Sequence, residues 1–223
     1  MDMVFRRWTL VAAGALILGG CGGGDEAQPQ GEPAPNIVQP GAPGQPSRTL
    51  SQGEFEAIES PEHVGADIDF MKGMVHHHAQ ALRMTALVPT RSRSRNVELL
   101  AQRIDLSQEG EIGQMTAWLE ARGEEAPDLH RAHGHAHGSG QVLMPGMLTD
   151  EEMKRLEGAK GPAFDRLFLG FMIRHHQGAL TMVHDLYEEG GGFESEVDAF
   201  ARHVGSDQTI EIVRMQGMLE GLG

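Results

Sequence analysis

Beyond about residue 63, apolar and polar positions follow a helical period over most of the chain. In four long stretches apolar side chains recur every three or four residues, which gathers them on one face of a helix. Leu, Ala and Met are common in these stretches, whereas aromatic residues make up only 5% of the chain, a composition that favours helix over strand. Four long helices with short or medium connections predict an all-α four-helix bundle. The predicted helices cover residues 64–88, 96–122, 162–189 and 195–222.

Helix-breaking and capping residues set the expected ends of these helices. Pro89 and Gly123 are expected to stop the first two, and Gly190 the third. Pro162 suits the first turn of the third helix. A shorter helix is predicted to begin near Thr149, because Thr-Asp-Glu-Glu at 149–152 matches a capping box.

The first twenty residues have the pattern of an export signal. Arg6 and Arg7 precede an uncharged, mostly apolar run that is too short to span a bilayer comfortably as a mature helix. The run ends in Leu-Gly-Gly-Cys at 18–21, which resembles the bacterial lipobox, and Cys21 is the only cysteine in the chain. We predict a lipoprotein signal peptide at 1–20 and lipid on Cys21, which would anchor the protein to the cell membrane or outer membrane, facing the periplasm or exterior. An ordinary secretory signal with an incidental cysteine is the alternative, and a twin-arginine signal fits poorly.

Residues 21–48 have no periodic apolar pattern and are rich in Gly, Pro, Gln and Ala. This composition predicts a disordered tether between the lipid and the folded part. The bundle domain is therefore expected over 49–223, with a His-rich linker near 124–148.

The bundle region contains an internal duplication. Residues 70–84 align with 168–182, and residues 108–119 align with 208–219. Each half has a His-His segment followed by a Gln-x-x-Glu-x-x-x-Met segment, so the bundle is predicted to consist of two duplicated helical hairpins. The coinciding pairs include Asp67/Asp165, Met74/Met172, His77/His175, His78/His176, Met84/Met182, Glu111/Glu211 and Met115/Met215.

The repeated histidines fall on the apolar faces of their helices. At about 100° per residue, His77 and His78 share the apolar arc, whereas His76 falls on the polar side. Met74 precedes His78 by one turn, and Asp67 lies on the same stripe. The second half repeats this arrangement. If the helices pack in sequence order, this face meets the Glu and Met face of the following helix inside the bundle.

Buried imidazoles and carboxylates cost free energy unless each finds a partner, and a metal ion satisfies several at once. Thioether sulfur together with imidazole nitrogen favours copper, as Cu(I) or Cu(II), while zinc could use the His and Glu. Inward His and Glu that hydrogen-bond across helices, with Met as core filler, are the alternative. The predicted metal ligands are Asp67, Met74, His77, His78, Met84, Glu111, Met115, Asp165, Met172, His175, His176, Met182, Glu211 and Met215.

Two further features bear on binding partners. The net charge is −14, from 32 acidic against 18 basic residues, which argues against nucleic acid. The tract from His130 to His137 holds four histidines and is expected either to bind metal weakly or to be a solvated loop.

The combined motifs resemble the family known as domain of unknown function 305 (DUF305), over roughly residues 54–222. The resemblance implies a ferritin-like four-helix bundle, often secreted or lipid-anchored, in a family whose members have been linked to copper binding and resistance in the periplasm. This sequence departs from the pattern in its third histidine, His76, in Met218 where the first half has Trp118, and in the His-rich insert. The matching residues are Asp165, Phe168, Met172, His175, His176, Ala179 and Met182, with Gln108, Glu111, Met115, Trp118 and Leu119.

Together these features predict a membrane-anchored lipoprotein that binds a transition metal, copper above others, as a chaperone, buffer or resistance protein, and that is not an enzyme. A metal-free helical module that binds an unknown protein partner at the cell envelope is the first alternative. A ferritin-like oxidoreductase is the second, and the absence of Glu-x-x-His from the sequence counts against it. No nucleophile–base pair, phosphate loop or haem attachment motif is evident.

Overall fold

The structure, a computed structural model, describes residues 37–56, 61–129 and 143–222. The described residues divide into two compact units, with the boundary between residues 58 and 59. The predicted signal peptide, Cys21 and the histidine tract at 130–137 lie outside the described residues. Within the described ranges, no helix combines the length and the apolar character needed to cross a membrane.

The first unit contains a small hairpin and a short helix. β1 (Ile37–Gln39) pairs antiparallel with β2 (Arg48–Leu50), and α1 (Gln52–Glu56) follows. The sequence predicted a tether without regular structure through residue 48, and the structure differs over 37–48. The reason is length, because strands of three residues are too short to produce a periodic apolar signal.

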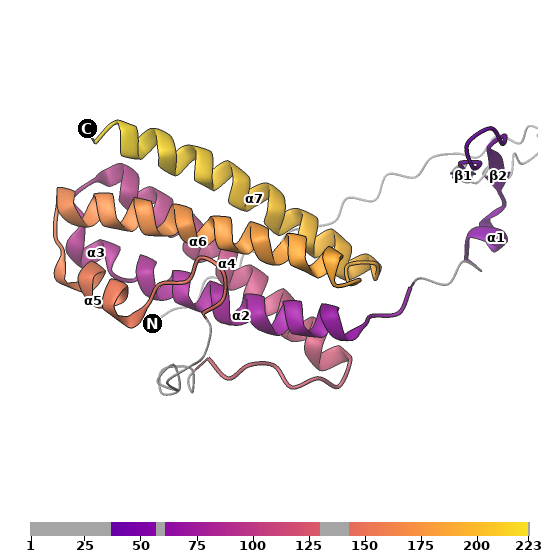
Figure 1. Ribbon diagram of the computed structural model, residues 1–223, viewed down its shortest axis with the longest axis horizontal. Helices are drawn as coiled ribbons and strands as arrows, with labels where there is room; N and C mark the ends of the chain where they lie inside the picture. Colours follow the sequence, from indigo (N-terminus) through magenta and orange to yellow (C-terminus); the bar gives the residue numbers. More distant parts are fainter. Residues whose placement is uncertain (1–36, 57–60, 130–142, 223) are drawn as a thin grey trace, which may run out of the picture. The chain divides into compact units, whose positions relative to one another are not determined.

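The second unit is a helical bundle, and the predicted all-α four-helix bundle is confirmed. In its described part the long helices are α2 (Gly65–Thr85), α4 (Arg95–Ala121), α6 (Pro162–Glu188) and α7 (Ser195–Glu220), which run side by side (Figure 1). α2 packs against α4 and α6 against α7, while α2 also contacts α6. Each duplicated half is therefore a helical hairpin, and the closest backbone contact between the hairpins is that of their first helices, α2 and α6.

Local signals explain most helix ends. The predicted capping box begins α5 (Asp150–Gly158), where the Thr149 hydroxyl accepts from the Glu152 N–H at 3.2 Å. The prediction that Pro89 stops the first helix is wrong, because α2 ends at Thr85 and Pro89 lies in the first turn of α3 (Val88–Arg91). Proline is tolerated there because the first N–H groups of a helix have no intrahelical acceptor.

The core consists of two apolar clusters with a polar layer between them along every long helix. In α2, for example, Met74 belongs to one cluster and Met84 to the other, with the histidine pair between them. The order is reversed along α6, because the two helices run antiparallel. The first cluster includes Ile104, Phe164, Phe168, Met84, Met172 and Met215, and the second includes Phe70, Leu119, Val204, Met74 and Met115, with Met182 packed against it.

The segment before α5 is docked on the bundle. The Gln80 amide donates to the Leu148 carbonyl at 3.0 Å and accepts from the Leu148 N–H at 2.7 Å. Pro145 lies against Gly178 so closely that a Cβ on Gly178 would come within 1.9 Å of the Pro145 carbonyl oxygen. Only glycine allows this approach.

Replacing Gly178 with Ala should therefore destabilise the bundle by about 1–3 kcal/mol, the usual cost of forcing extra volume into a packed contact. Urea unfolding followed by circular dichroism measures the change. Gly170→Ala is the matched control on the same helix, because a Cβ there meets nothing within 4 Å, and it should stabilise the protein by up to about 1 kcal/mol through helix propensity. Equal effects of the two substitutions would contradict the docking of this segment.

Candidate metal centre

Four imidazoles lie in a row across the interface between the hairpins. His77 and His78 on α2 and His175 and His176 on α6 are all fully buried. The His77 and His175 ring centroids are 3.8 Å apart, and each lies 6.4 Å from the ring of its sequence neighbour. We call these four residues the histidine row.

A carboxylate closes each end of the histidine row. The His78 Nε2 lies 2.6 Å from Glu111 Oε2 on α4, and the His176 Nε2 lies 2.7 Å from Glu211 Oε2 on α7. The duplication thus produces two equivalent His–Glu pairs. Each pair joins the two helices of one hairpin.

The hydrogen-bond partners of the histidine Nε2 atoms determine which ring nitrogen of each histidine carries a free lone pair. The Pro145 carbonyl can only accept, so the His77 Nε2 at 3.0 Å must donate to it. The Glu111 and Glu211 carboxylates likewise lie where they accept from the Nε2 of His78 and His176. A neutral ring then carries its lone pair on Nδ1, and the buried Nδ1 atoms of these three residues have no hydrogen-bond partner. Neither ring nitrogen of His175 makes a hydrogen bond of good geometry, although the His77 backbone lies close enough to act on the His175 pKa.

Burial keeps the centre of the histidine row neutral. Removal from water, reinforced by the neighbouring His78, lowers the pKa of His77 from 6.5 to about 3. Burial and the adjacent His77 hold the pKa of His175 well below its usual range. Neutral imidazole is the form that binds a metal ion.

Methionines flank the histidine row on both sides. Met74 and Met172 each lie one turn before the second histidine of their pair, about 6 Å along the axis, and both are fully buried. Met115 and Met215 are also fully buried. The duplication relates the two sets, so that Met74, Met115 and Met182 lie in or against one cluster and their counterparts Met172, Met215 and Met84 in the other.

The two predicted aspartate ligands lie elsewhere. Asp67 is ten residues from His77, about 15 Å along the helix axis. Its carboxylate accepts from the Val64 N–H at 2.8 Å and the Gly192 N–H at 2.6 Å, so it caps α2 and holds the α6–α7 connection. Asp165 is equally far from His175, in the first turn of α6. Since α2 and α6 are antiparallel, these aspartates lie at opposite ends of the bundle and share no site with the histidines.

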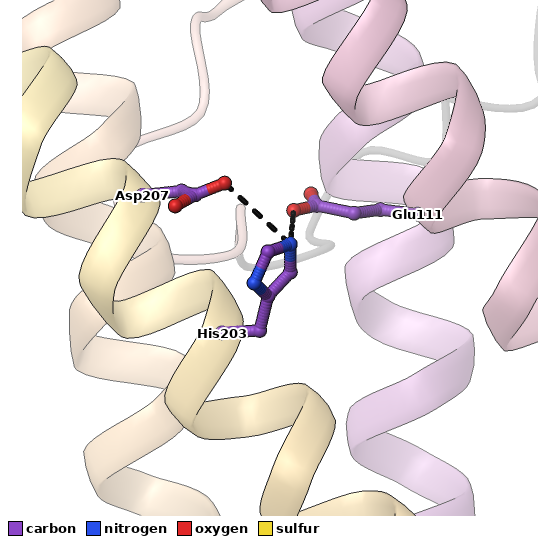
Figure 2. A group of neighbouring side chains, drawn as sticks. All are labelled: Glu111, His203 and Asp207. Carbon is purple, nitrogen blue, oxygen red and sulfur yellow. Dashed lines mark ion pairs between the residues drawn. The ribbon is translucent and has the colours of Figure 1, made fainter.

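A single cage of nitrogen and oxygen donors is not assembled around the histidine row. Among the described residues, the one group of three or more His, Asp and Glu donors within 4.8 Å of one another is Glu111, His203 and Asp207 (Figure 2). Sequence reasoning missed His203 and Asp207. Their four-residue spacing on α7, continued by Glu211, was the available signal.

Residues 67–219 match the model of a family described as Domain of unknown function (DUF305). The chain belongs to the DUF305 family. The crystal structure of a DUF305 fragment from Deinococcus radiodurans is 32% identical, with 72% of this chain and 99% of that chain covered and a TM-score of 0.61. A putative secreted DUF305 protein from Streptomyces coelicolor is 29% identical over 71% of this chain and 92% of its own, also with a TM-score of 0.61.

The bundle is also similar to CopM in its Cu(II)-bound form. The identity is 25%, with 70% of this chain and 97% of CopM covered and a TM-score of 0.58. CopM has also been solved in Cu(I)-bound and Ag-bound forms. No curated protein matches the chain.

The lowered pKa of His77 predicts acid sensitivity of this DUF305 protein. The pKa of His77 is 6.5 unfolded and about 3 folded, so the unfolded state binds more protons between these values. The free energy of unfolding is therefore not reduced by His77 above pH 6.5. As the pH falls below 6.5, protonation of His77 in the unfolded state lowers the free energy of unfolding, by up to about 1.4 kcal/mol per pH unit for one such group.

Urea unfolding from pH 7.5 to 4.5 measures this slope. His77→Gln should flatten it relative to the unchanged protein. His184→Gln, at an exposed position on α6, is the control and should leave the slope unchanged. A wild-type slope in His77→Gln would contradict a neutral, buried His77.

Proposed function

We propose that this DUF305 protein binds copper inside the bundle, through the histidine row and the methionines beside it. One observation carries the proposal. Three histidines have Nε2 held by a carboxylate or a carbonyl while Nδ1 is buried without a partner.

This arrangement is typical of metal-binding histidines. A ligating imidazole almost always donates its other N–H to a carboxylate or backbone carbonyl, which orients the ring and selects its tautomer. Histidines that only crosslink helices would use both nitrogens, because an unsatisfied buried polar atom costs about 1–3 kcal/mol. The orphaned nitrogens therefore favour a bound ion over the metal-free interaction module.

The donor types favour copper over zinc. Each half supplies imidazole nitrogen with buried thioether sulfur one turn away, and thioethers select Cu(I). Structural zinc takes four Cys, His or carboxylate ligands, and within the described residues no such set surrounds the histidine row. The duplication supplies two equivalent donor sets, His78 with Met74 and His176 with Met172. The likeness to CopM, solved with Cu(II), Cu(I) and Ag, supports the same choice.

We further propose that the protein is an exported lipoprotein, held at the membrane by lipid on Cys21. The lipobox-like sequence before Cys21 and the positive residues Arg6 and Arg7 support this placement. A tethered copper-binding bundle outside the cytoplasm would serve as a buffer, chaperone or resistance protein. Binding without catalysis is the role proposed.

Replacing Met74 and Met172 together by Leu tests copper binding with little change in packing volume. Loss of the sulfurs should weaken Cu(I) binding at least about tenfold, which corresponds to about 1.4 kcal/mol. Anaerobic competition of the full-length protein against a colorimetric Cu(I) chelator measures the affinity.

Met153→Leu is the matched control, since Met153 is a buried methionine on α5 outside the repeated set. It should bind Cu(I) like the unchanged protein. If the double variant also keeps full affinity, or if Cu(I) leaves the unchanged protein's thermal stability unaltered, the copper proposal fails and the interaction module gains support.

Cys21→Ser tests the membrane anchor. The variant should leave the membrane fraction and lose incorporation of labelled palmitate, because no other thiol in the chain can accept lipid. Fractionation and metabolic labelling measure both effects. Continued lipid labelling of Cys21→Ser would exclude Cys21 as the attachment site.

A further inference from the structure

We propose that Glu111, His203 and Asp207 form a second, partly exposed site for a divalent cation such as Zn(II) or Cu(II). This site shares Glu111 with the bundle interior, where that carboxylate holds His78, but it does not require copper to be bound there. Figure 2 shows the His203 ring reaching from α7 toward the Glu111 carboxylate on α4, with Asp207 one turn further along α7.

The distances suit one shared ion. The His203 Nε2 lies 3.8 Å from Glu111 Oε1 and 3.5 Å from Asp207 Oδ2, and all three donor atoms lie within 4.8 Å of one another. Donors that bind one ion at about 2.0–2.2 Å are separated by about 3–4 Å. Small side-chain shifts at the exposed His203 and the half-buried Asp207 would complete the geometry.

The buried partner distinguishes this group from a chance surface cluster. His203 and Asp207 are 55% and 39% exposed, but the Glu111 side chain is only 3% exposed. Its Oε1 has no hydrogen-bond partner and faces His203, while its Oε2 is held by His78. A buried carboxylate oxygen without a partner costs free energy that a cation would recover.

The donor set identifies the class of ion. One imidazole nitrogen with two carboxylate oxygens suits zinc and other borderline divalent ions, and the set lacks the sulfur that selects Cu(I). The exposed side leaves room for water as a further ligand. The ion would share Glu111 with His78, one carboxylate oxygen facing each site.

The site exists on one side of the bundle only. At the shift of 100 residues, His203 corresponds to Arg103 and Asp207 to Ser107. A guanidinium group has no lone pair to offer a metal and repels it. Glu211, the counterpart of Glu111, therefore lacks a matching pair on α4.

Calorimetric titration of the full-length protein with Zn(II) alone tests the proposal. His130, His133, His135 and His137 are first replaced by Ser, so that the tract does not compete. In this background His203→Ala/Asp207→Asn should weaken the tightest Zn(II) site at least about tenfold. The matched control His184→Ala/Asp185→Asn removes the same two side-chain types from an exposed face of α6 and should leave the affinity unchanged.

Two further measurements separate this site from the interior. The Met74→Leu/Met172→Leu variant should keep the Zn(II) affinity, and His203→Ala/Asp207→Asn should keep Cu(I) binding. Unchanged Zn(II) affinity in His203→Ala/Asp207→Asn, with a circular dichroism spectrum like that of the unchanged protein, would overturn the proposal. An equal loss of Zn(II) affinity in His184→Ala/Asp185→Asn would overturn the proposal as well. Zn(II) binding would then depend on the number of surface histidines and carboxylates and not on this site.

Discussion

Burial of four imidazoles in one dry layer is the constraint on which the rest of this bundle depends. Each ring loses its contact with water, so every ring nitrogen needs a hydrogen-bond partner or a ligand. For His77 and His175, burial also lowers the pKa. The protein satisfies one nitrogen each on His77, His78 and His176, using a carbonyl and two carboxylates. The Nδ1 atoms of these three residues are buried without a hydrogen-bond partner. These unpaired nitrogens are the observation on which the proposed copper binding rests.

The apolar clusters and the docked segment hold that layer in place. Each cluster draws residues from both hairpins, so the hairpins cannot separate without exposing apolar surface on both sides of the histidines. The segment before α5 adds a backbone carbonyl at Pro145, and Gln80 fixes the backbone at Leu148. A loop outside the duplicated pattern therefore sets the tautomer of His77, which the repeat alone does not.

The two hairpins are alike in the bundle interior but differ on its surface. The buried histidines, their glutamates and the flanking methionines are repeated, so both hairpins carry equivalent nitrogen and sulfur atoms in the interior. The surface residues are not repeated, and the histidine and aspartate near Glu111 have arginine and serine as counterparts. Glu111 connects the two environments, because one of its oxygens holds His78 and the other faces His203.

The sequence by itself determined the helices, the duplication, the DUF305 membership and the inward faces of both histidine pairs, because helical periodicity reports which side of a helix is apolar. Periodicity does not report how far apart residues on one face lie, so Asp67 and Asp165 were grouped with histidines about three turns away. It also says nothing about neighbours on other elements. Only the tertiary structure decided that Glu111 holds His78, that Pro145 holds His77, and that α7 brings His203 to Glu111, because these contacts join segments far apart in the chain.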